Sequence, residues 1–105
     1  MISFETMELL KSYWGDRVEA MACYCEVKYI DRSSKWACYI FGLNPDDDDE
    51  IACIIDGFDV EVCNWSLKEL QRLYNGDGDY VIEDKEFRRV RASELFKRLS
   101  ERKGR

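Results

Sequence analysis

Residues 51–62, Ile-Ala-Cys-Ile-Ile-Asp-Gly-Phe-Asp-Val-Glu-Val, decide the fold of this chain. Two short runs rich in β-branched and aromatic residues flank Asp56-Gly57, and this arrangement predicts a β-hairpin with a tight turn. A helix is expected directly afterwards, because Ser66 is a good N-cap and Glu69 lies three residues later, as in a capping box. Apolar residues at helical spacing would fold that helix back onto the hairpin.

Two further strands are expected before the hairpin, over residues 26–30 and 36–43. Helices are predicted at residues 3–14, with Gly15 as its C-terminal cap, at residues 16–22, and from Ser93 onward. The sequence therefore predicts a single α+β domain over residues 1–105: an antiparallel four-stranded meander with N-terminal helices, a central helix and a C-terminal helix.

The composition indicates a packed intracellular protein. Hydrophobic residues make up 46% of the 105 residues, and no apolar run approaches the roughly 20 residues of a membrane span. Residues 1–5 do not resemble a secretory signal, so we expect a cytoplasmic protein of a bacterial host cell, with no membrane partner. The five cysteines include no C-x-x-C pair, and Cys38 and Cys53 fall within predicted strands. Reduced, buried thiols are expected rather than a zinc site.

The charge is distributed asymmetrically along the chain. Residues 1–84 hold 7 basic and 19 acidic groups, which gives −12, whereas residues 85–105 hold 9 basic and 3 acidic groups, which gives +6. Histidine is absent, so Ser-His-Asp catalysis, Cys-His catalysis and histidine-bearing zinc sites are excluded. The carboxylates are scattered and no phosphate-binding glycine loop precedes a helix, so the chain is not expected to be an enzyme.

The densest block of charge is the acidic run at residues 46–50, which follows Asn44-Pro45. Such a run is ordinarily a solvated loop, but it could also hold a metal ion or imitate the phosphates of a nucleic acid. Binding to a protein would also need an apolar anchor, for which aromatic residues are the usual choice. The predicted partner-binding residues are therefore Asp46, Asp47, Asp48, Asp49, Glu50, Trp36, Tyr39 and Trp65.

Residues 75–87 resemble the calcium loop of an EF-hand. Oxygen ligands would come from Asn75, Asp77, Asp79 and Glu86, because calcium prefers several hard oxygens from one short loop. Tyr80 stands where such a loop needs glycine for its sharp turn, and there is no second EF-hand. The alternative interpretation is a glycine-rich turn followed by a short strand at residues 80–82.

The basic residues between positions 88 and 103 could contact phosphates. No aromatic residue is interleaved with Arg88, Arg89 and Arg91, as it would be in a single-strand binder. An exposed face that balances the acidic body is at least as good an interpretation, and direct nucleic-acid binding is not expected.

Several short motifs occur in an order that is similar to a small bacterial family of unknown function carried on plasmids, phages and integrative elements. The matching segments are Val27-Lys28-Tyr29, Trp36, residues 57–62, residues 66–70 and residues 82–87. The resemblance covers about residues 26–90, and the Cys-rich strands, the acidic run and the N-terminal helices depart from it. It implies a mobile-element protein without an established enzyme activity, in which Asp84 and Phe87 belong to a strand-and-turn element.

Two functions follow from these observations. The first is a small acidic phage or plasmid protein that inhibits a host defence nuclease by stoichiometric binding, as anti-CRISPR and antirestriction proteins do. Its partner would be the nuclease or its nucleic-acid-binding channel, which an acidic body could occupy. The alternative is a calcium-binding module that uses the EF-hand-like loop, with calcium as its cofactor.

Overall fold

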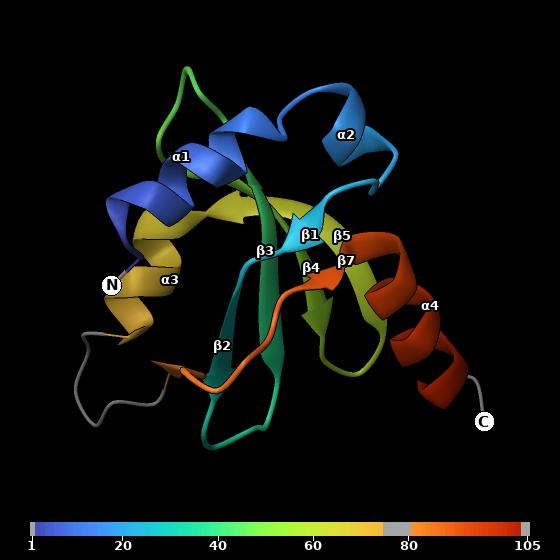
Figure 1. Cartoon of the computed structure of the whole chain (residues 1–105). Coiled ribbons are helices and arrows are strands. Elements are labelled where there is room, and N and C mark those ends of the chain that lie inside the picture. Colours follow the sequence, from blue (N-terminus) through green and yellow to red (C-terminus); the bar gives the residue numbers. More distant parts are fainter. Residues whose placement is uncertain (1, 75–80, 104–105) are drawn as a thin grey trace.

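The computed structural model describes residues 2–74 and 81–103. Four helices and seven strands make up this part of the chain (Figure 1). The helices are α1 (Phe4–Ser12), α2 (Asp16–Glu19), α3 (Leu67–Tyr74) and α4 (Ala92–Lys103). The strands are β1 (Tyr24–Cys25), β2 (Val27–Asp31), β3 (Ala37–Leu43), β4 (Glu50–Asp56), β5 (Val60–Ser66), β6 (Val81–Glu83) and β7 (Val90–Arg91).

The main sheet has five strands in the order β5-β4-β3-β2-β6, and every neighbouring pair is antiparallel. A separate two-stranded sheet joins β1 to β7. The α+β class is confirmed, but the predicted four-stranded sheet is wrong, because β6 adds a fifth strand beside β2. The residues of β6, β1 and β7 form runs of only two or three, too short for a periodic pattern to place them in a sheet.

The central hairpin forms as predicted, but its turn differs. Asp56 pairs with Val60, so the loop has three residues instead of two, and Gly57 does not have a positive φ. Glycine is required here for a different reason: a Cβ on Gly57 would lie 2.9 Å from the indole ring of Trp36. Phe58 then packs against the same indole edge to face, with ring centroids 5.4 Å apart.

The predicted helix starts are partly confirmed. Ser66 Oγ accepts the backbone N–H of Glu69 at 3.1 Å, as an N-cap does, but the Glu69 carboxylate pairs with Arg72 instead of completing the capping box. The first helix ends at Ser12 rather than at residue 14. Gly15 has a φ of 99° but stands at the N-cap of the short α2, where no side-chain cap bond forms.

The helices cover both faces of the sheet. In Figure 1 the β1–β7 sheet lies in front of the central strands, α4 lies beside β5, and α1 crosses the end of the sheet near the β3–β4 loop. The opposite face carries α3, because Leu70 lines the same pocket as Tyr29 and Cys38. Among the described residues, no helix is long and apolar enough to cross a membrane.

The core lies between these layers, and an irregularity in β3 shapes one side of it. The register of β3 against β4 shifts between Ile40 and Gly42, so a β-bulge occurs at Phe41. A Cβ on Gly42 would lie 2.6 Å from Val18 of α2, so a larger residue there would displace that helix. The largest fully buried side chains are Tyr29, Phe41, Leu10, Ile40, Leu43, Ile51 and Ile54.

Candidate partner-binding surface

The acidic run lies in the β3–β4 loop except for Glu50, which begins β4, and one of its members holds the start of α3. The Asp49 carboxylate accepts the Lys68 backbone N–H at 2.7 Å and the Ser66 hydroxyl, while the Asp49 carbonyl accepts the Leu67 N–H at 2.7 Å. These contacts, first of all the Lys68 N–H, hold the pKa of Asp49 below its usual value. The sequence predicted Ser66 as the N-cap, and the structure adds Asp49, from a distant position in the chain, to the same helix terminus.

The other acidic residues of the loop differ in how far they are committed to internal contacts. Glu50 accepts from the amides of Asn44 at 2.9 Å and Asn64 at 2.7 Å. Asp48 forms an ion pair with Lys11 at 3.1 Å, although its side chain is 69% exposed. Asp47 accepts the backbone N–H of Asp49, and the exposed Asp46 donates its backbone N–H to Asn44 Oδ1.

Trp65 lies directly beside this loop. A shallow depression of about 260 Å³ is lined by Asp47, Asp49, Glu50, Asn64, Trp65 and Ser66. Trp65 is 36% exposed, so an apolar ring stands at the edge of a cluster of carboxylates. We call residues 46–50 together with Trp65 the acidic–aromatic patch.

The two other predicted aromatic anchors do not join this patch. Trp36 is 41% exposed but lies beside the β4–β5 turn, at the opposite end of the sheet. Tyr39 is only 6% exposed and packs against Phe87, with ring centroids 5.7 Å apart, so it does not offer the exposed ring that an anchor needs. An apolar groove of about 370 Å³, whose lining includes Cys38, Ile55 and Cys63, has Trp36 and Trp65 in its walls.

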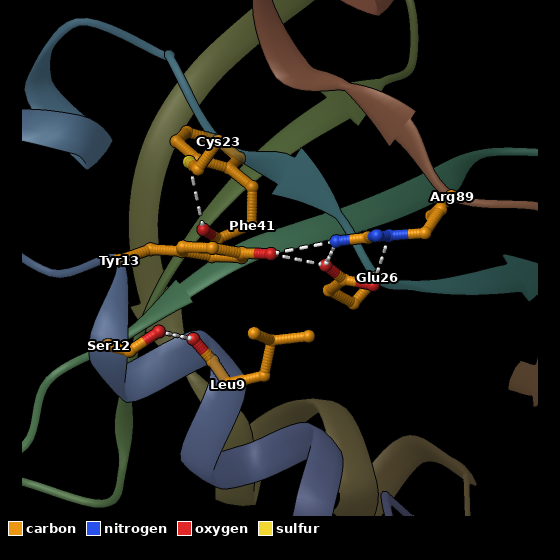
Figure 2. Close-up of polar contacts among 7 residues, drawn as sticks. All are labelled: Leu9, Ser12, Tyr13, Cys23, Glu26, Phe41 and Arg89. Carbon is orange, nitrogen blue, oxygen red and sulfur yellow. Dashed lines mark hydrogen bonds and ion pairs between the residues drawn. The ribbon is translucent and has the colours of Figure 1, made fainter.

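A polar cluster that the sequence did not predict ties the N-terminal helices to the C-terminal segment (Figure 2). The Tyr13 hydroxyl donates to Glu26 at 2.6 Å, and the Arg89 guanidinium donates to both oxygens of the same carboxylate, at 3.1 and 2.7 Å. Arg89 also donates to the Tyr13 oxygen at 3.0 Å. Each group satisfies the others, so the cluster is a structural tie. Its members lie far apart in sequence, and no local pattern links them.

The basic segment also gains an aromatic neighbour from elsewhere in the chain. The guanidinium carbons of Arg89 and Arg91 lie 4.1 and 5.3 Å from the ring centroid of Tyr24. Because Arg89 is already paired with Glu26, this stacking serves first to hold β7 against β1. Tyr24 belongs to the first third of the chain, so no pattern within the basic segment could predict this neighbour.

All five cysteines are free thiols, and four of them are buried. Burial raises the pKa of Cys25 to about 12, and Cys23 donates to the Phe41 carbonyl at 3.3 Å (Figure 2). Cys63 is half-buried, and its Sγ lies 3.8 Å from Sγ of Cys53, the residue directly opposite on β4. Protonated thiols of this kind react slowly.

The predicted calcium ligands fall mostly outside the described residues, since Asn75, Asp77 and Asp79 lie between residues 74 and 81. Val81 begins strand β6. Glu86, the fourth predicted ligand, lies in the turn after β6 and donates its backbone N–H to Asp84 Oδ1. Within residues 2–74 and 81–103, no group of three or more Cys, Asp or Glu side chains could hold a metal ion. The calcium hypothesis stays a prediction.

Ionisation of Tyr13 should destabilise the fold at alkaline pH. Burial, together with the hydrogen bond to Glu26, raises the pKa of Tyr13 from 10.0 to about 12. Because the folded-state pKa lies above the unfolded one, its contribution to stability is complete below pH ~10 and is lost as the pH rises toward ~12. Urea unfolding across this range should show the loss, and Tyr13→Phe should show a smaller one. An equal loss in the variant would contradict this assignment.

Comparison of the chain with models of known protein families, with curated proteins and with solved structures finds no match.

Proposed function

We propose that this protein acts by stoichiometric binding and inhibits a host defence nuclease of the CRISPR or restriction kind. The acidic–aromatic patch would enter the basic channel that the nuclease uses for nucleic acid. The observation that carries this proposal is the position of Trp65 beside Asp47, Asp49 and Glu50 around one depression. The patch combines charges that match a phosphate-binding surface with an apolar anchor.

The two parts of the patch would have different effects on binding. Exposed carboxylates speed association with a basic surface and are screened by salt, whereas a desolvated tryptophan supplies affinity. The loop is also held in place before binding, because Asp49 is bonded to α3 and Glu50 to two asparagine amides. A preordered loop loses less conformational entropy when it binds.

Further support comes from the charge and the sequence. Residues 1–84 carry −12, and the chain has no histidine for the common catalytic arrangements. The resemblance to a family carried on phages and plasmids agrees with an inhibitor that a mobile element would bring into a bacterial cell.

A DNA-cleavage or phage-plating assay against a panel of CRISPR and restriction systems tests this proposal. We expect the wild type to protect against at least one system, and Trp65→Ala to lose about tenfold or more in inhibitory potency. Trp36→Ala is the matched control, because this tryptophan is similarly exposed but lies at the other end of the sheet. If Trp36→Ala lost inhibition and Trp65→Ala kept it, the acidic–aromatic patch would not be the binding surface.

A second variant tests the charges and spares the contacts that hold α3. Asp46, Asp47 and Asp48 are replaced together by asparagine, while Asp49 is kept because it caps α3 and its removal would disturb that helix. We expect weaker inhibition, with the difference from wild type largest at low salt. Unchanged inhibition would remove the acidic loop from the mechanism, and no protection by the wild type against any system would remove the function itself.

A further inference from the structure

Strand β5 is an edge of the main sheet, and although α4 packs against it, none of its seven residues is buried. Its seven residues pair with β4 without a bulge, and β4 is its only hydrogen-bonded neighbour among the described strands. It contains no proline, lysine or arginine, and its one charged residue is Glu61. Natural sheets normally shield long edges with such residues, with bulges or with short strands.

Exposed apolar side chains lie on both faces of this strand. Val62 is 45% exposed and Trp65 is 36% exposed, and an odd separation along a strand places them on opposite faces. A partner that docked flat on one face would cover only one of them. A strand added to the edge could bring side chains to both.

The hydrogen-bonding pattern shows which backbone groups of β5 face outward. The Leu67 N–H bonds to the Asp49 carbonyl, whereas the Glu50 carbonyl accepts from Asn44 on the other side of β4. Hydrogen-bonded and non-hydrogen-bonded pairs alternate in an antiparallel ladder. Val62 and Asn64 therefore direct their backbone N–H and C=O groups away from β4.

We propose that β5 pairs in antiparallel fashion with β5 of a second copy of this chain, with Cys63 on the two-fold axis. In this register Val62 of one copy lies opposite Asn64 of the other. The outward N–H of each residue donates to the outward C=O of the other, so the pair forms two hydrogen bonds. All seven residues of each strand are paired, and the two main sheets become continuous. The proposal does not rest on the proposed function, but Trp65 belongs to both surfaces, so the dimer and the nuclease would compete for it.

The strand is complementary to itself in this register. Glu61 lies opposite Trp65, so no charge on the strand faces a like charge, and both exposed apolar residues gain a cross-strand neighbour. The whole chain carries a net charge of −6, so the two copies repel one another at long range. Dimerisation should therefore strengthen as salt is added.

The position of Cys63 gives a direct chemical test. It would face its own copy in a non-hydrogen-bonded pair, with Cα atoms about 4.5 Å apart, which is within the range of a disulfide. The test uses Cys53→Ser, which removes the competing thiol within the chain. Diamide, an azo oxidant, takes two electrons and two protons from the two Cys63 thiols and is reduced to the hydrazine as the S–S bond forms. The reaction is run at mildly alkaline pH, because burial raises the pKa of Cys63 to about 12.

We expect a covalent dimer whose link maps to Cys63 by mass spectrometry, and no such dimer when Cys63→Ser is added. Light scattering and sedimentation of the reduced protein, from micromolar to millimolar concentration, give the dissociation constant of the dimer. Val62→Pro removes an outward N–H that β4 does not use, and it should raise this constant at least about tenfold. Val62→Thr, which keeps the N–H, is the matched control.

Thermal melting and circular dichroism check that the proline variant is folded. If it is not, Val62→Lys adds a charge to the edge and keeps the backbone donor, and it should weaken the dimer to a similar extent. A wild type that remains monomeric at every concentration would overturn the proposal. A dimer that survives both variants and does not cross-link at Cys63 would also overturn it, because a different surface would then join the copies.

Discussion

Replacing Phe41 with alanine should lower the free energy of unfolding by about 3–5 kcal/mol, the usual cost of removing a buried aromatic side chain. Phe41 is fully buried at the β3 bulge. Phe41 and Gly42 both lie beside Trp14 and Val18, so the bulge turns this part of β3 toward the N-terminal helices. The loss would leave a cavity that the rigid sheet cannot close, and urea unfolding of the variant measures it.

Phe58→Ala is the matched control for this measurement. The same side chain is removed, but Phe58 is 86% exposed and contacts the Trp36 ring only at its edge. A change of about 0.5 kcal/mol or less is expected there. Similar losses in the two variants would show that the bulge does not hold the N-terminal helices as the structure indicates.

Replacing Arg89 with methionine should cost about 2 kcal/mol of stability. The change leaves Glu26, whose side chain is only 8% exposed, with the Tyr13 hydroxyl as its remaining partner in the cluster. Breaking a fully buried ion pair costs about 3–5 kcal/mol. The value is lower here because the Arg89 side chain is 52% exposed and water screens part of the interaction.

Arg98→Met provides the comparison. Arg98 pairs with Glu94 at 2.8 Å, close to the 2.7 Å of the Arg89 pair, but both side chains of the Arg98–Glu94 pair are more than half exposed. Such a helical surface pair contributes about 0.3–0.5 kcal/mol. Equal effects in both variants would mean that the burial of Glu26 does not matter, and that the cluster is an ordinary surface contact.

The local parts of the fold could be predicted from the sequence. The runs on either side of Asp56-Gly57 and the N-cap at Ser66 are short-range signals, and both appear in the structure as β4, β5 and the start of α3. The two-stranded sheet could not be predicted, because Tyr24 and Arg91 are brought together only by the complete fold. The sequence predicted Gly57 in the turn of the hairpin. Glycine is needed there because the Trp36 ring lies close to its Cα, and not because the backbone has a positive φ.

In the candidate site, too, local features could be predicted from the sequence, whereas contacts made only by the complete fold could not. The acidic loop and Trp65 could be identified as separate features, but their proximity results from the pairing of β4 with β5. The burial of Tyr39 could not be predicted, because all seven residues of β3 are buried, and a strand covered on both faces has no polar alternation to mark an exposed side. The sequence does not distinguish Asp49 from the other four acidic residues of the run, because its role at α3 depends on contacts that span the hairpin.

The pairing of β1 with β7 also bears on the order in which the chain folds. The β4–β5 hairpin and α3 are adjacent in sequence, so they close short loops and can form early. The small sheet joins the first third of the chain to its last fifth, and the Cys23 and Met21 carbonyls accept the first N–H groups of α4. During synthesis, those carbonyls stay unbonded and the apolar face beneath them stays exposed until α4 has left the ribosome. A nascent chain stalled before α4 should therefore be the species most prone to capture by chaperones.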